Sequence, residues 1–302
     1  MENKEDPLVE NYGTLFVVST PIGNLEDITL RALKILNIVT MIAAENVIHT
    51  TKLCKHYEIK TELMSYNQHN RRVKAPELIR LLKKGNDLAM VTDAGTPGIS
   101  DPGNYLVNQA LKDKIQISPI PGPSAVAAAI SVSGLAANSF IFAGFLPNKT
   151  GKRKKELKKL AFESRTLIFF EAPHRIKAML IDLKEIFGER QMVMVREMTK
   201  MFEEVKKDSV SNILNHLESR KIRGEFTLVV EGWNKRNKFR GLNADAAIRL
   251  DKLLNEQKMS VKDIAILISR EEGCSYREIY KDCLIRKKVP EGSKQNGIKQ
   301  KA

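Results

Sequence analysis

The sequence lacks the features of several protein classes. Its 302 residues include only three cysteines, whose spacing suits neither a disulfide framework nor a metal site. No apolar run approaches the roughly 18 residues that a membrane-spanning helix needs. Residues 1–10 carry four acidic side chains and no apolar core, unlike a signal peptide. We therefore expect a cytoplasmic protein with reduced thiols and no membrane association.

Common catalytic motifs are missing as well. No Gly-x-Ser-x-Gly, Walker or Gly-x-Gly-x-x-Gly motif occurs, and the five histidines do not have the spacing of metal ligands. A lone histidine in such a pattern is more often a surface residue or a hydrogen-bonded residue than a ligand. These absences argue against a serine nucleophile, a polyphosphate loop, a dinucleotide site and a metal centre.

Positive charge is abundant. The chain has 50 Lys and Arg against 36 Asp and Glu, a net charge of +14, and residues 233–302 supply +8 of it with 17 basic and 9 acidic residues. A second basic cluster comprises Lys152, Arg153, Lys154 and Lys155. Basic patches attract polyanions by releasing counterions from phosphates, although a solvated lysine-rich surface has the same composition. The charge favours a nucleic-acid partner.

The pattern of apolar runs predicts two α/β domains, at 13–122 and 123–232. Short apolar runs alternate with amphipathic segments, which indicates a mostly parallel sheet with right-handed crossovers. Strands are expected at 14–18, 38–44, 88–91, 115–120, 140–143, 166–171, 192–196 and 226–231. Helices are expected after Asn24, from Pro76 to Gly85, at 105–111, 125–133 and 152–162, from Pro173 to Gly188 and from Ser209.

The last part of the chain has a different composition. We expect a polar linker at 233–242, a small basic helical domain at 243–288, and flexible tails at 1–12 and 289–302. The three short helices of this domain are expected to begin near Asn243, Ser260 and Ser275. Asp263 follows Ser260, and Glu278 follows Ser275, at the spacing of a capping box. The helices are equally consistent with RNA binding and with dimerisation.

A loop rich in glycine and proline follows the apolar run 88–91. Residues 93–103 contain three glycines and two prolines, which neither a strand nor a regular helix tolerates. In open α/β sheets, ligands bind at such loops beyond the carboxyl ends of strands, although an ordinary strand-to-helix connection remains an alternative. The loop predicts a small-molecule pocket.

Similar stretches occur at other predicted strand ends, namely 21–24, 121–124, 144–147, 171–175, 196–200 and 224–225. Each alone is compatible with ordinary turn chemistry. Together they place polar and cyclic side chains at one edge of both predicted sheets, so that a cleft between the two domains is the expected pocket.

Taken in order, these stretches resemble the tetrapyrrole-methylase-like family of S-adenosylmethionine enzymes, and within it the methyltransferases of small-subunit ribosomal RNA. The matching residues are 20–25, 93–97, 120–125, 144–147, 171–175, 196–200 and 224–226. The resemblance implies two α/β domains with S-adenosylmethionine between them, a homodimer, and 2′-O-methylation of a cytidine ribose in the decoding region of 16S ribosomal RNA. A tetrapyrrole C-methyltransferase and a non-catalytic RNA-binding or ribosome-assembly factor stay open as alternatives.

The resemblance also assigns site residues. It implies that the cofactor is bound by Asp93, Ala94, Gly95, Thr96, Pro97, Ile99, Ser124, Ala125, Phe145 and Leu146. We expect RNA to be bound by Lys152, Arg153, Lys154, Lys155, His174 and Arg175. A positioned base would help to remove the proton of a ribose hydroxyl. The main candidates are Glu45, Glu197 and Lys200, each at a predicted strand end; Glu171 is another candidate.

One stretch departs from the family pattern. Where the family usually has Ala-Glu-Asp-Thr-Arg-His-Thr, residues 44–50 are Ala-Glu-Asn-Val-Ile-His-Thr. Ile48 in place of arginine removes five hydrogen-bond donors and a fixed charge that could hold a phosphate or a carboxylate. We expect this departure to affect RNA positioning or catalytic efficiency more than cofactor binding.

Overall fold

The structure is a computed structural model that describes residues 11–218, 221–233, 244–256, 258–272 and 276–287. It divides into two compact units, Met1–Gly232 and Trp233–Ala302, which are described separately. The predicted tails and linker lie almost wholly outside the described residues. No helix among the described residues is long and apolar enough to cross a bilayer.

The first sheet of the larger unit is entirely parallel. It comprises β1 (Leu15–Val18), β2 (Met41–Ala44), β3 (Glu62–Ser65), β4 (Leu88–Val91) and β5 (Ile117–Ile120), in the order β3-β2-β4-β1-β5. This confirms the predicted α/β class. Strand β3 was not predicted, because its sequence Glu-Leu-Met-Ser has no apolar run.

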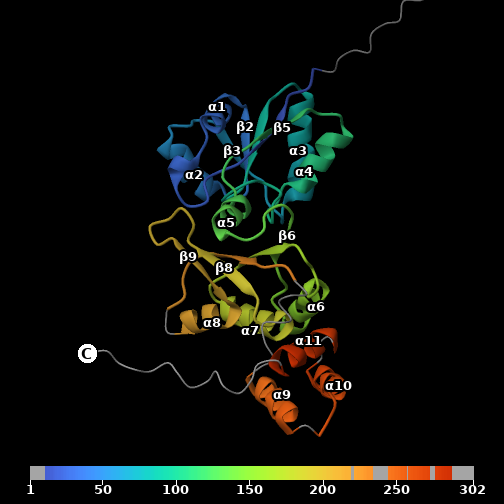
Figure 1. The fold of residues 1–302 in the computed structure, drawn as a ribbon. Helices are drawn as coiled ribbons and strands as arrows, with labels where there is room; N and C mark the ends of the chain where they lie inside the picture. The colour runs from blue at the N-terminus through green and yellow to red at the C-terminus, as the bar shows by residue number, and fades with distance from the viewer. Residues whose placement is uncertain (1–10, 219–220, 234–243, 257, 273–275, 288–302) are drawn as a thin grey trace, which may run out of the picture. The chain divides into compact units, whose positions relative to one another are not determined.

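Helices cover both faces of this sheet (Figure 1). One apolar core lies between the sheet and α1 (Leu30–Ile38) with α2 (Val47–His56), and another between the sheet and α3 (Arg71–Lys83) with α4 (Asn104–Lys112). Strands buried on both faces require apolar residues at nearly every position. All four residues of β4 are accordingly buried.

Two helix starts differ from the prediction. Asn24 caps a short 3-10 turn (Leu25–Asp27), and α1 begins only after Thr29, whose side chain accepts the backbone N–H three residues further on. Helix α3 begins at Arg71, so that Pro76 lies inside the helix instead of opening it. Asn24 and Pro76 both favour helix starts, and each was assigned to the start of a helix that begins elsewhere in the structure.

The second sheet is mixed. It comprises β6 (Phe140–Phe145), β7 (Thr166–Glu171), β8 (Gln191–Arg196), β9 (Glu204–Ser209) and β10 (Phe226–Val230), in the order β6-β7-β10-β8-β9. Only β6 and β7 pair in parallel; the other neighbours are antiparallel. The mostly parallel arrangement predicted from the alternation of strands and helices therefore holds for the first sheet alone. The polar strand β9 was also missed.

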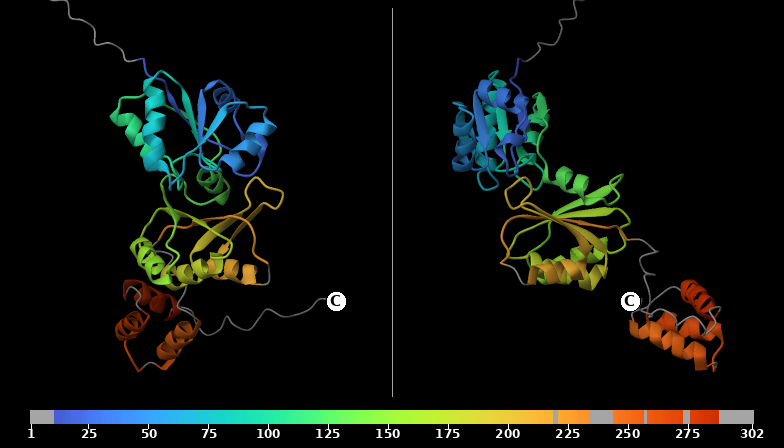
Figure 2. Two further views of the ribbon diagram at one scale, coloured as in Figure 1. Left: turned by 180° about the vertical axis from the view of Figure 1, so that it is seen from behind. Right: turned by 60° about the vertical axis from the view of Figure 1, so that its left-hand side comes forward.

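Two apolar cores hold helices against this second sheet. On one face lie α6 (Thr150–Leu160), α7 (Ile176–Phe187) and α8 (Val210–Glu218), and on the other lies α5 (Ala125–Ser133) (Figure 2). The carboxyl ends of β6, β7 and β8 and the amino end of β10 share one edge, because Phe226 pairs with Glu171 on one side and with Arg196 on the other.

The smaller unit contains α9 (Ala244–Glu256), α10 (Val261–Glu271) and α11 (Tyr276–Lys287). They pack around a core that includes Leu250, Ile264 and Ile279. The hydroxyl of Ser260 accepts the Asp263 N–H at 3.1 Å, which confirms the predicted helix cap. The predicted start at Ser275 lies outside the described residues.

Candidate functional site

The central loop lies where the winding of the first sheet reverses. From β1 the chain proceeds to β2 and β3, and from β4 it returns past β1 to β5, so that β1 and β4 are neighbours whose connections lead in opposite directions. Ligands bind in the crevice at the carboxyl ends of such a strand pair. Backbone N–H groups of Thr20 and Gly95 each donate to the other's carbonyl at 2.9 Å. This pairing fixes the loop after β4 against the loop after β1.

Backbone conformation shapes the same loop. Gly95 and Gly98 have φ values of 77° and 87°, a region that glycine enters without steric cost. Ser100 has a φ of 64° although it has a Cβ atom. Backbone strain of this kind costs about 1–3 kcal/mol and tends to cluster at functional sites. The strained residue directly precedes Asp101, which lies on a cavity wall.

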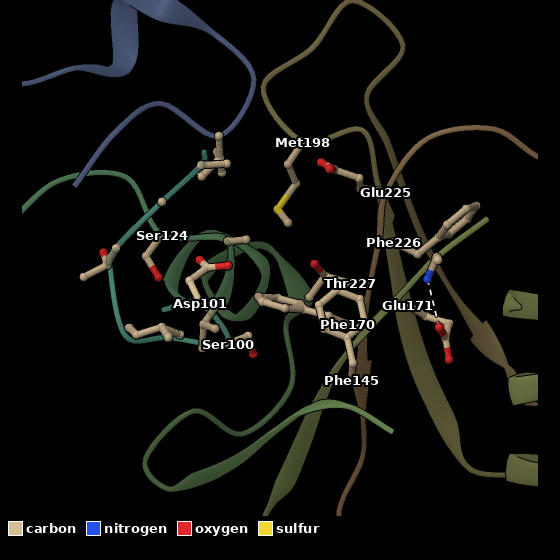
Figure 3. Close-up of a pocket in the computed structure, with 18 of the residues that line it drawn as sticks. Ser100, Asp101, Ser124, Phe145, Phe170, Glu171, Met198, Glu225, Phe226 and Thr227 are labelled. Atoms are coloured by element: carbon tan, nitrogen blue, oxygen red, sulfur yellow. Dashed lines mark hydrogen bonds between the residues drawn. The ribbon is translucent and has the colours of Figure 1, made fainter. Parts of the chain in front are cut away.

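A cavity of about 480 Å³ lies between this loop and the near edge of the second sheet (Figure 3). Its walls comprise Ile22, Ala94, Gly95, Thr96, Ile99, Ser100, Asp101, Ser124, Ala125, Val126, Phe145, Phe170, Glu171, Ala172, Pro173, His174, Met198, Glu225, Phe226 and Thr227. The rings of Phe145 and Phe170 pack edge to face, with their centroids 5.6 Å apart. This cavity, the larger of two neighbouring cavities, is therefore mainly apolar and aromatic, with a few polar groups, as small-molecule sites usually are.

The predicted cofactor residues divide into three groups. Those that line the larger cavity are Ala94, Gly95, Thr96, Ile99, Ser124, Ala125 and Phe145. Asp93 lines a neighbouring cavity instead. Pro97 and Leu146 line neither; Leu146 is 6% exposed within the core and its carbonyl accepts a hydrogen bond from Arg175.

Several lining residues were not predicted individually. Phe170, Met198 and Asp101 are examples, and each lies in or beside a punctuated stretch at a strand end. The sequence therefore marked the segments but did not show which side chains face the cavity.

The neighbouring smaller cavity has a volume of about 290 Å³. It is lined by Thr20, Pro21, Ile22, Gly23, Leu25, His49, Thr50, Lys52, Leu53, Thr92, Asp93, Ala94, Lys200 and Glu225. Ile22, Ala94 and Glu225 line both cavities. The two spaces are thus adjacent, and the smaller one has the more polar and basic lining.

Three carboxyl groups lie close to this shared wall, in addition to Glu225, which is part of it. Glu45 Oε2 accepts the Asp93 N–H at 3.3 Å. Burial and the charge of Asp93 raise the pKa of Glu45 despite that hydrogen bond. Burial, together with the charges of Glu45 and Asp93, raises the pKa of Asp101 to about 7. The wall is therefore electrostatically suited to a cationic ligand.

The predicted bases Glu197 and Lys200 are engaged with one another. Lys200 Nζ lies 2.9 Å from Glu197 Oε1 and 3.1 Å from Glu225 Oε2. Partial burial opposes the charged form of Lys200, but hydrogen bonds to both carboxylates outweigh it and raise the pKa of this ammonium. Burial likewise opposes the charge of Glu197, yet its hydrogen bonds from Lys200 and from the Glu225 N–H lower its pKa. Lys200 lines the smaller cavity, whereas Glu45 and Glu197 line neither.

The basic helix α6 corrects one predicted RNA contact. Arg153 is 2% exposed, and its Nε donates to Asp182 Oδ2 at 2.7 Å in a buried ion pair. It cannot reach an RNA phosphate, so that its assignment to RNA binding was wrong. Lys154 pairs with Glu185, whereas Lys152 and Lys155 are exposed.

The other two predicted RNA residues lie at the carboxyl end of β7. His174 is exposed and lines the larger cavity. Arg175 Nε lies 3.0 Å from Glu171 Oε1, and its guanidinium also donates to the Leu146 carbonyl. Burial raises the pKa of Glu171, although the Ala172 N–H and the charge of Arg175 oppose this shift. Arg175 thus holds the segments after β6 and β7, which form part of the cavity wall, against each other.

The stretch that departs from the family pattern forms the start of α2. Asn46 Oδ1 accepts the N–H groups of Ile48 and His49 at 3.1 and 3.3 Å, the capping role that an aspartate would also fill. Ile48 is 76% exposed. The replacement therefore preserves the helix start and the place of His49, and leaves an apolar side chain where a guanidinium would project.

Metal ligation finds no support in the described part of the chain. Within it, no group of three or more His, Cys, Asp or Glu side chains is placed to hold a metal ion.

Comparison with known proteins gives concordant matches. Residues 14–214 match the family described as Tetrapyrrole (Corrin/Porphyrin) Methylases. The chain is 41% identical over 277 residues to ribosomal RNA small subunit methyltransferase I of Pseudomonas aeruginosa, covering 91% of this chain and 98% of that protein. It is 45% identical over 220 residues to the protein of the same name from Thermotoga maritima, covering 73% and 99%. A solved cobalt precorrin-4 methyltransferase shares the fold, with a TM-score of 0.56 at 16% identity over 72% of this chain and 94% of that one.

Proposed function

Because the chain belongs to the tetrapyrrole (corrin/porphyrin) methylase family, we propose that it is an S-adenosylmethionine-dependent methyltransferase of small-subunit (16S) ribosomal RNA. The acceptor is the 2′-oxygen of a cytidine ribose in the decoding region. One observation carries this proposal: the identity of 41% to a named ribosomal RNA methyltransferase extends over 91% of the chain, which is more than the unit with the two α/β sheets and includes much of the basic helical unit.

The larger cavity fits the cofactor. S-Adenosylmethionine combines an adenosine with a sulfonium, an ammonium and a carboxylate group, so that its net charge is positive. Phe145 and Phe170 provide aromatic surface, and the Asp101 carboxyl, crowded by Glu45 and Asp93, gains a favourable partner when a cation binds beside it. The volume of about 480 Å³ lies within the range of small-molecule sites. Residues proposed to hold the cofactor are Ala94, Gly95, Thr96, Ile99, Ser124, Ala125 and Phe145.

The protein's main contribution to the reaction is alignment. When bound, S-adenosylmethionine supplies a methyl group that is already activated for displacement. The walls contributed by both sheets would hold acceptor and donor in line, and such positioning can supply much of the reduction in barrier. A base that removes the hydroxyl proton typically contributes a further 10²- to 10⁴-fold.

Exposed basic residues would hold the RNA. Lys152 and Lys155 face solvent on α6, and residues 233–302 carry a net charge of +8. Lysines at the surface neutralise phosphates without reading sequence, whereas contacts to 2′-hydroxyls distinguish RNA from DNA. Methylation of ribosomal RNA would require the protein to be in the cytoplasm.

We also propose a homodimer. Met201 and Phe202, in the connection between β8 and β9, are 90% and 69% exposed. Large apolar side chains that project together are typical of interaction surfaces. Analytical ultracentrifugation of the full chain should give twice the monomer mass of 34.1 kDa, and a mass of one chain at micromolar concentration would contradict the dimer.

Methyl transfer onto small ribosomal subunits that lack the modification tests the proposed function. Purified protein and labelled S-adenosylmethionine should place label on one ribose of the decoding region. Absence of transfer despite measurable cofactor binding would favour a non-catalytic RNA-binding factor. Label on a porphyrinogen in a parallel assay, with none on RNA, would favour a tetrapyrrole C-methyltransferase.

Two substitutions on α5 provide a matched control. Ala125 lines the larger cavity, whereas Ala127 on the same helix is exposed. Ala125→Trp should fill the cavity and abolish cofactor binding and transfer. Ala127→Trp adds the same bulk outside the cavity and should retain both.

A further inference from the structure

The smaller cavity shares part of its wall with the proposed cofactor cavity. Ile22, Ala94 and Glu225 line both spaces. A group seated in the smaller cavity therefore lies next to the wall, formed partly by Ala94, that also bounds the larger one. A transfer between two bound molecules requires such an arrangement.

The lining of the smaller cavity suits a ribose and its phosphate. Three threonines line it, although the hydroxyls of Thr20 and Thr92 donate to the backbone carbonyls of Thr92 and Ala94. Lys52, Lys200 and His49 contribute basic groups. Hydroxyls and ammonium groups recognise sugar hydroxyls and phosphate oxygens. At about 290 Å³ the space lies near the lower end of small-molecule sites, the size expected for one nucleotide rather than for a macrocycle.

A histidine and a carboxylate meet at this cavity. His49 Nδ1, in the first turn of α2, lies 3.4 Å from Asp93 Oδ1 after β4. Asp93 Oδ1 is enclosed and makes no hydrogen bond within the described part of the chain. Catalytic hydrogen bonds are often long before substrate binds and tighten afterwards. With Nδ1 directed at the carboxylate, the opposite ring nitrogen, Nε2, remains for another partner on a side chain that is 52% exposed.

We propose that the smaller cavity binds the ribose of the target nucleotide and that His49 Nε2 accepts the proton of its 2′-hydroxyl. Asp93 acts as a positioning residue that holds Nδ1–H and so leaves Nε2 unprotonated. In the step, the 2′-oxygen forms a bond to the methyl carbon while the carbon–sulfur bond breaks and leaves its electron pair on sulfur. The hydroxyl proton moves to Nε2 and then to water. This inference rests on the proposed function.

Other titratable groups nearby are less suited to this task. The ion pairs of Lys200 with Glu197 and Glu225 keep its ammonium protonated, so that it can bind a phosphate but cannot accept a proton. Asp101 lines the larger cavity alone, and Glu45 lines neither. Among the predicted bases, Lys200 alone belongs to the described lining of the smaller cavity, where His49 also lies.

Single-turnover methyl transfer with saturating cofactor and subunits tests the role of His49. His49→Ala should slow transfer by about 10²- to 10⁴-fold, and added imidazole should restore at least about tenfold of that loss. Its cofactor Kd and thermal midpoint should match the wild type. His56→Ala, at the other end of α2 and outside both cavities, is the matched control and should transfer at the wild-type rate. Asp93→Asn should slow transfer less than His49→Ala does.

A transfer rate for His49→Ala within about threefold of wild type would overturn the proposal. A slowed variant that imidazole does not rescue, or that has lost cofactor binding, would also overturn it, because His49 would then have a structural role. An inactive wild-type protein would contradict the proposed function instead.

Binding to the cofactor-free protein provides a readout independent of activity. Cytidine 5′-monophosphate should shift the imidazole NMR signals of His49, assigned from their loss in His49→Ala, and leave those of His56 in place. In Asp93→Asn the His49 shift should become smaller, because the ring is no longer held at the cavity. Unchanged His49 signals at saturating nucleotide would overturn the assignment of the smaller cavity, whatever the activity of the protein.

Discussion

The two cavities share a wall but differ in lining, and both sheets contribute to the difference. Both open at the carboxyl ends of β1 and β4. The larger one also takes aromatic side chains from β6 and β7, Phe145 and Phe170. In the described lining of the smaller one, the side chains from the second sheet's segments are Lys200, after β8, and Glu225, before β10. The second sheet therefore makes the larger cavity aromatic, whereas most of the polar lining of the smaller one, including His49, Lys52 and Asp93, comes from segments that connect strands of the first sheet.

This comparison implies that a cation affects ligand binding only where it faces a cavity or solvent. The largest expected effect is on stability, when the buried Arg153 is replaced. Arg153→Met would remove the closer partner of the buried Asp182 and leave it Lys154, whose Nζ lies 3.7 Å from Asp182 Oδ1. Breaking a buried pair typically costs about 3–5 kcal/mol. Urea unfolding should show this loss, while the Kd values for cofactor and RNA stay within about twofold of wild type. Weaker RNA binding by a variant that remains folded at the assay temperature would reinstate Arg153 as an RNA contact.

The apolar character of the larger cavity is tested at Phe170. Its ring contacts Phe142 at 4.8 Å and Phe145 at 5.6 Å, edge to face in both cases. Phe170→Ala removes aromatic surface and loosens the neighbouring ring, so that the cofactor Kd should rise by about 30-fold, equivalent to roughly 2 kcal/mol. Calorimetry measures this directly. Phe162→Ala, which changes an exposed ring outside both cavities, is the control.

Much of this architecture could be predicted from the sequence because its causes are local. Apolar runs identified β1, β2, β4 and β5, and the glycine- and proline-rich residues 93–103 identified the ligand-binding edge. The strands that were missed, β3 and β9, consist of half-exposed or charged residues. They are strands because a neighbouring strand pairs with them, a cause that no short window of sequence contains.

The composition of the site was less predictable, because it depends on the directions of side chains from distant segments. Arg153 belongs to a run of four basic residues, yet the helix turns it inward towards Asp182. His49 had the pattern of a lone surface histidine, and only the fold brings Asp93 to its ring. The family pattern contained His49 and Asp93 but did not join them.

The carboxyl on the larger cavity's wall predicts a pH dependence of cofactor binding. Asp101, with a pKa of about 7, is largely neutral at pH 6 and largely ionised at pH 8. Since a carboxylate attracts a cation, the cofactor Kd should fall by about tenfold as the pH rises from 6 to 8, a difference of roughly 1.4 kcal/mol. Asp101→Asn should remove most of this dependence. A wild-type Kd that does not vary with pH would place the cationic part of the cofactor away from Asp101.

Stability of the cofactor-free protein should change in the opposite sense. The folded state raises the pKa of Asp101 above its usual value, so the folded protein holds this proton more tightly than the unfolded chain does. The associated stability is present at acid pH and is lost as the pH rises through about 7. The thermal midpoint should therefore fall less between pH 6 and 8 in Asp101→Asn than in the wild type. Equal falls in both proteins would mean that Asp101 is not the titrating group.

The polar character of the smaller cavity leads to the smallest expected effect. Lys52, exposed on α2, lines this cavity and not the larger one. Lys52→Ala should weaken binding of the RNA substrate by about three- to tenfold and reduce the slope of log Kd against log salt by about 0.7, the contribution of one phosphate contact on a single strand. The cofactor Kd should not change. Lys60→Ala, an exposed lysine just before β3 and outside both cavities, controls for the general loss of charge. If both variants lower the salt slope equally, Lys52 acts through the overall field of the protein, and the contrast between an apolar cofactor cavity and a polar acceptor cavity loses its support on the acceptor side.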